Sequence, residues 1–385
     1  MSESRDRLVR CWSHIQGTLF PWLREEVDEL TAKHEQVVLV LDMLDLETHI
    51  PPPPGGRGRP PEDRRAIARA FVAKAILHLP TTAALIERLD VDGRLRRICG
   101  WERRRQVPSE ATFSRAFAEF ATSGLFERVH EALVKFGHDG RLVEHVARDA
   151  TGIDAREKPP PPPKDSAPKR KRGRPKAGEA VTKRRSDRLK RQPNLDLRTM
   201  LADLPTRCDV GSKRNSKGFR HQWIGYKLHL DIADGDVPVA AVLTSASVHD
   251  SQVAIPLITI TSGRIQYLYD IMDSAYEATA IADYSRRLGH QPMIEASNRH
   301  HPGRRAKNAA EQKRLRRIRF ALPEHRRFHA RVAAERGAGA LKDNLGACTV
   351  RVRGHAKVLC HLGFGILALT ANNLLRLVRP QPQAT

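Results

Sequence analysis

The sequence predicts an α/β domain preceded by an all-α helical domain, and three observations support that prediction. Apolar residues recur with helical spacing through most of the chain up to about residue 137. Beyond residue 140 the pattern changes to buried or alternating strand-like segments that are separated by helical ones. Runs of Pro, Gly and basic residues mark the boundaries between these parts. A series of strands and helices that follows a run of helices is typical of two separate units.

The charge balance indicates a polyanionic partner. Lys and Arg number 67 against 44 Asp and Glu, which gives a formal net charge of +23. Nucleic acid is the most economical partner for so basic a chain. The five cysteines are scattered and never form a C-x-x-C pair, so neither a disulfide framework nor a zinc site is predicted. The N-terminus has no apolar signal core, and polar residues interrupt the most apolar run, 359–375, so we expect a cytoplasmic protein with a buried helix there.

The helical half divides at a run rich in Pro, Gly and Arg. Residues 1–50 form an N-terminal helical segment and residues 51–62 a linker, because Pro and Gly interrupt helices. Residues 63–140 predict three helices, and the last of them begins after Ser109 as its N-cap. Short helices with Ser, Thr and Arg at a helix start suit DNA recognition by a helix-turn-helix. We interpret 63–140 as a DNA-binding or dimerisation domain, although a purely structural helical bundle fits the same pattern.

The α/β half is interrupted by a basic segment. Residues 141–155 contain a buried strand, RLVEHVARDATGID, that is predicted to end at Asp149. Residues 156–219 are interpreted as a basic disordered insert, since 156–191 alone holds 15 Lys or Arg against 4 Asp or Glu. Residues 220–379 then alternate between strands such as WIGYKLHLDIA and IQYLYDIMD and helical segments. Together, 141–155 and 220–379 are predicted to form one α/β domain.

Three acidic residues stand where such a fold can bring them together. Asp149 ends the first strand, Asp273 ends a later one, and Glu335 lies in the helical stretch FHARVAAERGAGALK. Neighbouring carboxylates repel one another unless a cation joins them, and oxygen ligands suit Mg²⁺ or Mn²⁺. Two such ions about 3.5–4 Å apart activate a nucleophilic oxygen and stabilise the leaving oxygen of a phosphodiester. In so basic a chain, the three acids predict phosphodiester chemistry on nucleic acid.

Each acid also has a structural interpretation that the sequence leaves open. Asp149 and Asp273 suit turn-capping positions at ATGID and DSAY. Glu335 suits an i,i+4 ion pair with Arg331 on a solvated helix, worth roughly 0.2–0.5 kcal/mol. Asp250 is the main rival as second ligand, although its place ahead of a helix favours an N-cap. The lesser rivals are Asp154, Glu157 and Asp270.

Three ordered motifs carry a resemblance to a known family. Phe328, Arg331, Glu335 and Lys342 form F-x2-R-x3-E-x6-K, which resembles the Y-x2-R-x3-E-x6-K signature of DDE-type bacterial insertion-sequence transposases, with Phe in place of Tyr. DSAY at 273–276 resembles that family's second motif, D-x-G/A-Y/F, and RDATGIDAREKP resembles the region of its first aspartate. Further stretches, among them PSEATFSRAF, WIGYKLHLD and LTSASVHDSQVAIPL, read like the same group, so the resemblance covers most of the chain.

The resemblance implies a ribonuclease-H-like catalytic domain in which Asp149, Asp273 and Glu335 hold two Mg²⁺ or Mn²⁺ ions. It implies a DNA transposase that cleaves transposon ends and transfers 3′-hydroxyl ends to target DNA. Its partners would be the terminal inverted repeats and target DNA, with a homodimer in the DNA complex. Arg331 and Lys342 would meet the phosphate backbone, and Phe328 would anchor the helix in the core. The alternatives are a catalytically inactive transposase-derived DNA-binding protein and a stand-alone nuclease.

The run ERGAGALK departs from the family pattern. Gly337 and Gly339 each lower helix propensity by up to about 1 kcal/mol. Gly339 shares the face of Glu335 and suits a close approach of DNA. The sequence gives no reason for the small residues Gly337 and Ala338, which indicates a loosened active site or a decaying copy. On that view, Gly337→Val with Ala338→Asn raises cleavage. If Gly337 instead admits the transposon end, the same variant lowers cleavage.

Basic residues outside the catalytic motifs are further candidates for DNA contact. The two RGRP tetrads place Arg57, Arg59, Arg172 and Arg174 in sequences that resemble the cores of minor-groove AT-hooks. Nonspecific attraction to phosphate is the simpler interpretation of the same residues. Lys227, on the polar face of WIGYKLHLDIA, is another candidate.

Overall fold

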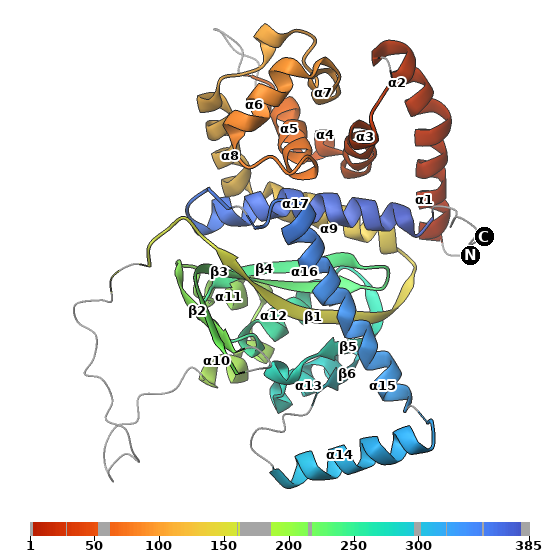
Figure 1. Ribbon diagram of the computed structural model, residues 1–385, viewed down its shortest axis with the longest axis vertical. Coiled ribbons are helices and arrows are strands. Elements are labelled where there is room, and N and C mark those ends of the chain that lie inside the picture. The colour runs from red at the N-terminus through yellow and green to blue at the C-terminus, as the bar shows by residue number, and fades with distance from the viewer. Residues whose placement is uncertain are drawn as a thin grey trace.

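The computed structural model describes residues 3–27, 29–52, 62–159, 161, 186–214, 218–295, 302–320, 322–348 and 350–378. A helical domain lies on one side of the long helix α17 (His355–Arg376), and a sheet of six strands lies on the other (Figure 1). This arrangement of an all-α part and an α/β part agrees with the fold class predicted from the sequence.

Helices form the N-terminal part, as predicted. They are α1 (Glu3–His14), a π-helical turn (Ile15–Leu19), α2 (Phe20–Val27), α3 (Ala32–Leu44), α4 (Leu46–His49), α5 (Arg64–Ile76), α6 (Thr82–Val91), α7 (Gly93–Cys99), a 3₁₀ turn (Arg104–Gln106), α8 (Glu110–Ser123) and α9 (Leu125–His138). The last predicted helix is divided in two, because Gly124 adopts a φ of 63° between α8 and α9. Ser109 is the N-cap residue of α8, as predicted, but its side chain makes no capping hydrogen bond.

The sheet is mixed, with parallel and antiparallel strand pairs. Its strands are β1 (Leu142–Asp154), β2 (Asp209–Arg214), β3 (Arg220–Ala233), β4 (Val237–Ser245), β5 (Gln266–Met272) and β6 (Gln291–Ile294). β1 is antiparallel to β3 and parallel to β5, and β5 is parallel to β6. β2 and β4 both pair antiparallel with β3. The sheet order places β1 between β3 and β5, so the first strand is central.

The first strand does not end at Asp149, so that prediction is wrong. β1 continues to Asp154, and Gly152 is an interior residue of the strand. A Cβ atom on Gly152 would lie 2.8 Å from Cε2 of Trp223 on the neighbouring strand β3. The glycine therefore marks a close approach of the indole ring to the backbone, which the sequence pattern ATG could not distinguish from a turn.

The described part of the predicted basic insert is folded. It contains α10 (Ser186–Arg191), a 3₁₀ turn (Gln192–Asn194), α11 (Leu197–Ala202) and β2. Leu189, Leu195 and Met200 belong to an apolar cluster with residues of α12 (Ser251–Ser262) and α13 (Thr279–Arg287). The prediction of disorder is therefore wrong over 186–214, because the excess of basic charge obscured regularly placed apolar residues. Residues 162–185, with Arg172 and Arg174, lie outside the described part of the chain.

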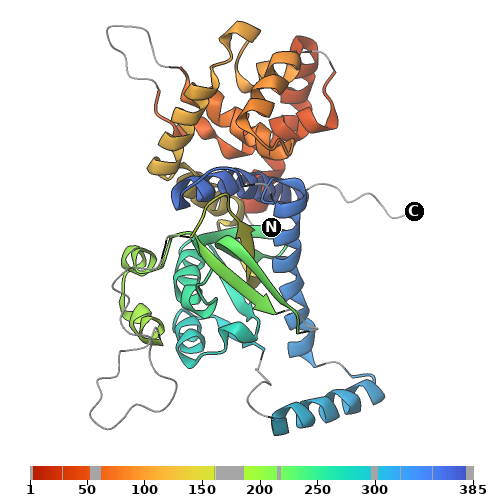
Figure 2. The ribbon, with the colours of Figure 1, turned by 60° about the vertical axis from the view of Figure 1, so that its left-hand side comes forward.

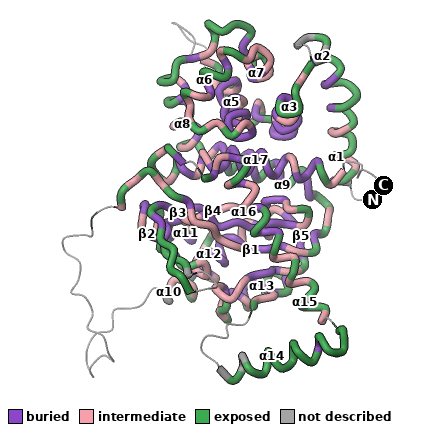
Figure 3. Tube along the Cα trace, viewed as in Figure 1, coloured by how far each residue is buried: buried purple, intermediate pink, exposed green. Residues whose placement is uncertain are grey.

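One apolar core joins the helical domain to the sheet. α17 packs against α3, α5, α8 and α9 on one side and against β4 on the other (Figures 1 and 3). Phe364 of α17 stacks on Phe71 of α5 with ring centroids 5.5 Å apart. α17 has the length and composition of a membrane-crossing helix, but 83% of its most apolar window is buried inside the fold. It is the buried helix that the sequence predicted at 359–375.

The helix predicted over 328–342 is interrupted. α15 (Pro323–Phe328) ends in a 3₁₀ turn (His329–Arg331), and α16 (Val332–Asn344) begins after it. Phe328 is half-buried and absent from the apolar core, so its predicted role as a core anchor is wrong. Its ring centroid instead lies 5.9 Å from Cζ of Arg331. The 3₁₀ turn changes the angle between Phe328 and the residues of α16, which a uniform helical wheel cannot anticipate.

Gly337 has a packing role that the sequence did not reveal. It is buried where α16 crosses the sheet, and a Cβ atom there would lie 2.9 Å from Cδ1 of Ile232 on β3. Ile232 is completely buried, so it has little room to move. Gly339 faces open space, because the nearest atom to a Cβ there is Oδ2 of Asp343 at 4.0 Å. Gly337 is therefore required for close packing, whereas a side chain at position 339 would meet open space.

We expect Gly337→Val to lower the free energy of unfolding by about 1–3 kcal/mol, because the added side chain overpacks the contact with Ile232. Gly339→Ala is the matched control and is expected to raise it by up to about 1 kcal/mol, through helix propensity alone. Urea unfolding of both variants measures the two changes. Equal or greater stability of Gly337→Val would mean that α16 and β3 are not packed as closely as described.

Candidate functional site

Two aspartates lie side by side on neighbouring parallel strands. Asp149 is in β1 and Asp273 directly follows β5, and the register places Arg148 opposite Met272. The next residue of each strand is therefore also adjacent. Oδ1 of Asp149 accepts a hydrogen bond from the N–H of Ala150 at 2.8 Å. Asp149 caps no turn at ATGID, whereas Oδ1 of Asp273 does accept from the N–H of Ala275 at 2.9 Å in the DSAY turn.

The surroundings of Asp149 disfavour its charged form. Burial raises the pKa of its carboxyl, and the charges of Asp273 and Asp250 raise it further, which outweighs the lowering by the Ala150 N–H and by Lys213. Within the described ranges, no Lys, Arg or His forms an ion pair with Asp149 or Asp273. Two adjacent acids without an ion-pair partner are suited to binding a hard cation.

The sheet register shows which face carries Asp149. Asp149 is opposite Leu230 and Ala147 is opposite Ile232, so all four side chains are on one face of the sheet. Gly337 of α16 packs against Ile232, so α16 crosses that same face. The helix that carries Glu335 and the aspartate of β1 are therefore on the same side of the sheet.

Glu335 itself is engaged with a neighbouring base. Its Oε1 accepts from Nη2 of Arg331 at 2.6 Å, which is the i,i+4 ion pair considered from the sequence, and half of its side chain is exposed. In the part of the chain that the structure describes, no group of three or more His, Cys, Asp or Glu is arranged to hold a metal ion. The structure thus brings Asp149 and Asp273 together and places Glu335 on their side of the sheet, but not beside them.

Asp250 lies on the opposite face of the sheet. Its Oδ1 accepts from Nζ of Lys227 at 2.9 Å and is 3.9 Å from Nδ1 of His229. Lys227 and His229 are opposite Gly152 and Ala150, which point away from the Asp149 side. Burial acts to raise the pKa of Asp250, but His229 and Lys227 outweigh it and lower the pKa. Asp250 is the N-cap residue of α12, as predicted, but its carboxylate binds Lys227 and makes no capping hydrogen bond.

The lesser acidic rivals are placed elsewhere. Asp270 is fully buried in an ion pair with Arg148, and Glu157 accepts hydrogen bonds from the Tyr226 hydroxyl and the N–H of Gly354. Asp154 is exposed at the far end of β1. A shared face of the sheet thus distinguishes the predicted acids, Asp149, Asp273 and Glu335, from these alternatives.

Two family models match the chain. Residues 144–371, more than half of its length, match the transposase DDE domain, and residues 25–119 match the transposase domain DUF772. The chain belongs to the DDE transposase family. This agrees with the insertion-sequence transposases that the motifs resemble, and the matched range contains Asp149, Asp273 and Glu335. No curated protein and no solved structure matches the transposase.

The DNA-binding candidates of the transposase have different positions. Arg331 is paired with Glu335, and Lys342 is half-buried on α16. Lys227 is mostly buried and donates to Asp250 and to the carbonyl of Val248, so its position gives no support to a predicted DNA contact. Arg57, Arg59, Arg172 and Arg174 lie outside the described residues.

The sequence did not single out three residues around the aspartates of the transposase. Arg148 is completely buried beneath Asp149, and only its unusual place in an apolar strand hinted at a role. Lys213, exposed on β2, is close enough to lower the pKa of Asp149. The hydroxyl of Tyr276 is buried, has no hydrogen-bond partner among the described residues, and feels the charges of Asp250, Asp149 and Asp273. Tyr276 belongs to the DSAY motif, but no sequence signal indicated that its hydroxyl is unpaired.

Proposed function

We propose that this transposase cleaves transposon ends and transfers the 3′-hydroxyl ends to target DNA, with Asp149, Asp273 and Glu335 as its catalytic acids. The proposal rests on one observation: two adjacent aspartates without an ion-pair partner lie on the face of the sheet that α16 crosses. A basic chain supplies the attraction to DNA that such chemistry needs. The alternative is a transposase-derived protein that binds DNA without cutting it.

The residues present fit a divalent cation in part. Asp149 and Asp273 offer hard oxygen ligands, and the pKa of Asp149 is raised mainly by burial and further by the charge of Asp273, both of which a bound cation would offset. We propose that these two acids and Glu335 would hold two Mg²⁺ or Mn²⁺ ions. Such ions supply activation of the attacking oxygen and stabilisation of the leaving oxygen when bound.

Glu335 has to leave Arg331 to join the aspartates, and the exposure of their ion pair makes this change inexpensive. The side chains of Arg331 and Glu335 are 24% and 51% exposed, and an i,i+4 pair of this kind contributes only about 0.3–0.5 kcal/mol. Once released, Arg331 is free to meet a DNA phosphate from the same face. In this proposal, the ion pair holds the side chains of Arg331 and Glu335 next to each other until DNA binds.

The test is an assay on the ends of the element itself. Sequencing the DNA that flanks the gene identifies matched inverted repeats, and duplexes that contain them serve as substrates. We expect Mg²⁺-dependent strand cleavage and a joined product with target DNA. Binding without cleavage would support the inactive alternative, and cleavage without a joined product would indicate a nuclease.

A projecting basic helix is the strongest candidate for a DNA contact outside the acids. α14 (Pro302–Arg317) lies apart from the sheet and the other helices (Figures 1 and 2) and is exposed along most of its length (Figure 3). Lys313, Arg316 and Arg317 are exposed near its C-terminal end. Arg314 is less available, because it pairs with Glu311 at 2.6 Å. We propose that α14 binds the phosphate backbone.

We expect Arg316→Gln with Arg317→Gln to weaken binding to all DNA sequences alike. Removing one phosphate interaction lowers the slope of log affinity against log salt concentration by about 0.9. Arg5→Gln with Arg10→Gln is the control, since both residues are exposed on α1, which lies beside α17 on the other side of the sheet from α14 (Figure 1). Fluorescence anisotropy over a salt series measures both slopes. The same slope in the α14 variant and wild type would exclude a backbone contact by these two residues.

Two further features of the proposal follow from the reaction. Both ends of an element have to be cut and joined to one target, so we propose a homodimer in the DNA complex, with one acid site for each end. We also propose that the protein works in the cytoplasm, where bacterial DNA is found. Sedimentation of the protein with end duplexes tests the first point.

A further inference from the structure

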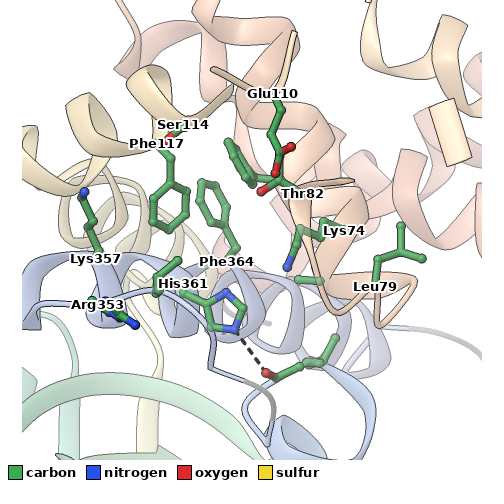
Figure 4. Close-up of a pocket in the computed structure, with 15 residues that line it drawn as sticks. Lys74, Leu79, Thr82, Glu110, Ser114, Phe117, Arg353, Lys357, His361 and Phe364 are labelled. Carbon is green, nitrogen blue, oxygen red and sulfur yellow. Dashed lines mark hydrogen bonds between the residues drawn. The ribbon is translucent and has the colours of Figure 1, made fainter. Parts of the chain in front are cut away.

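A cavity of about 330 Å³ lies between the helical domain and α17 (Figure 4). Residues of α5, α6 and α8 line it on one side, and residues of α17 and the loop before it line the other. None of the three proposed catalytic acids is among the residues that line it. The cavity is therefore separate from the site described above and has no part in the proposed cleavage.

Lys74 of α5 gives this cavity an unusual chemistry. Its residue is only 7% exposed, and within the described ranges it forms no ion pair with an acid. Its ammonium group points into the space between α5 and α17, toward the ring of His361 (Figure 4). Burial lowers the pKa of Lys74 to about 8, so the group is still largely protonated at neutral pH. The ammonium faces the cavity without an acidic partner, so the burial that lowers its pKa is not compensated by an opposite charge until an anion enters from outside.

The rest of the lining is suited to an anion. Arg353 and Lys357, both exposed, stand across the cavity from Lys74, and the hydroxyl side chains of Thr82 and Ser114 also line it. Glu110 is the acidic residue of the lining. His361 contributes no charge, because burial lowers its pKa to about 4, and its Nε2 donates to the carbonyl of Gly346 at 3.2 Å. Three cations thus outnumber one carboxylate around a space that water can reach.

The size of the cavity limits what the anion is. A volume of about 330 Å³ is at the lower end of the range for small-molecule sites and exceeds what a lone inorganic anion fills. Phe117 and Phe364 supply an aromatic wall beside the cations (Figure 4), and Phe71 also lines the cavity. Cations beside aromatic rings are the combination that binds a phosphate together with a base.

We propose that this cavity binds a nucleotide phosphate, with Lys74 as the buried contact and Arg353 and Lys357 at its mouth. The phosphate belongs either to a free nucleotide or to the 5′ end of a DNA strand, and both sources present the same group to Lys74. Binding compensates the buried charge of Lys74, so occupation stabilises the junction between the helical domain and α17. The inference is independent of the three acids, because no step of the proposed cleavage uses this cavity.

Lys74→Met in the full chain tests the proposal. The substitution keeps the volume and removes the buried charge, so we expect the variant to fold and to unfold at a higher temperature than wild type. Calorimetric titration with 5′-dAMP is expected to show binding to wild type and a loss of affinity of about tenfold or more in Lys74→Met. Deoxyadenosine, which lacks the phosphate, is expected to bind neither protein. Arg353→Gln with Lys357→Gln is a second, surface variant, expected to weaken dAMP binding without affecting folding.

Duplexes with a 5′-phosphate or a 5′-hydroxyl end distinguish the two sources. If the DNA end is the occupant, wild type prefers the phosphorylated duplex and Lys74→Met does not. If only dAMP depends on Lys74, the occupant is a free nucleotide. Equal affinity of wild type and Lys74→Met for every phosphate probe, equal binding of dAMP and deoxyadenosine, or no binding of any probe would overturn the proposal. Since no cleavage is measured, these results leave the proposed function untouched, and a failure of the cleavage assay leaves this inference untouched.

Discussion

Asp149→Asn, Asp273→Asn and Glu335→Gln are each expected to lower cleavage of transposon ends by about a thousandfold and to leave affinity for the same DNA nearly unchanged. Each substitution keeps the size of the side chain and removes the charge that a divalent cation needs. The fold is expected to survive, since no ion pair involves the two aspartates in the described ranges and the pair made by Glu335 is half-exposed. Strand cleavage with Mg²⁺ and anisotropy with end duplexes measure the two properties.

A readout other than activity separates a metal ligand from a general catalytic role. Mn²⁺ is expected to raise the unfolding temperature of wild type, because a ligand specific for the folded state stabilises it. Asp149→Asn and Asp273→Asn should lose that rise. A full rise in either variant would mean that the aspartate is not a ligand, whatever the variant does to cleavage.

Asp250→Asn is the control for the assignment of the second acid. Asp250 lies across the sheet from Asp149 and binds Lys227, so its removal should lower stability through an unpaired, mostly buried lysine and leave cleavage by the folded protein intact. If Asp273→Asn cleaved as well as wild type and Asp250→Asn did not, the second acid would be Asp250.

Residue patterns predicted the type of most elements but failed where glycines and charges were interpreted by their average behaviour. Helical and alternating periodicity found α5 and β3, because burial of one face produces those patterns, and a long apolar run found the buried helix α17. Gly152 and Gly337 were interpreted as a turn and as a loosened helix. In the structure, both glycines admit a large neighbour, Trp223 in one case and Ile232 in the other. Residue propensities depend on the local sequence, so they cannot predict which distant residue packs against a glycine.

In the candidate site too, the sequence predicted the residues but not their arrangement in space. Motifs indicated Asp149, Asp273 and Glu335, yet they could not show that Asp250 lies on the other face, since this depends on the register of β1 against β3. The sequence offered the Arg331–Glu335 pair and the metal site as competing interpretations. The structure has the pair, on the face where the aspartates lie, so the two interpretations are compatible as successive states of one helix.

Arg148 is the clearest case of a residue whose role no local sequence pattern predicts. It is completely buried, and its Nε and Nη2 each donate to Asp231 at 2.7 Å, while Nη2 also donates to Asp270 at 3.3 Å. The Thr261 hydroxyl donates to Asp231, and the Ser285 hydroxyl donates to Asp270, both at 2.6 Å. Burial acts to lower the pKa of Arg148, but the two carboxylates outweigh it and raise the pKa, so the guanidinium is charged. The network connects β3, β1 and β5 directly beneath Asp149.

We expect Arg148→Met to lower the free energy of unfolding by about 3–5 kcal/mol, since it leaves two buried carboxylates without their counter-charge. Arg336→Met is the matched control: Arg336 also binds one aspartate, Asp236, through Nε and Nη2, but its side chain is 57% exposed. Loss of that surface pair should cost less than about 1 kcal/mol. Urea unfolding measures both changes, and equal costs would mean that Arg148 is not buried as described.

The effect of Arg148→Met on cleavage then shows what the network does for the site. Arg148 touches neither aspartate of the site, but it fixes β1 against β5, and Asp149 and Asp273 are the next residues of those strands. If the network serves stability alone, cleavage falls only by the fraction of protein unfolded at the assay temperature. We expect a larger fall, because a shift of about 1 Å between catalytic groups is enough to lower a rate about a hundredfold. Circular dichroism at the assay temperature gives the folded fraction, and cleavage per folded molecule equal to wild type would limit Arg148 to a structural role.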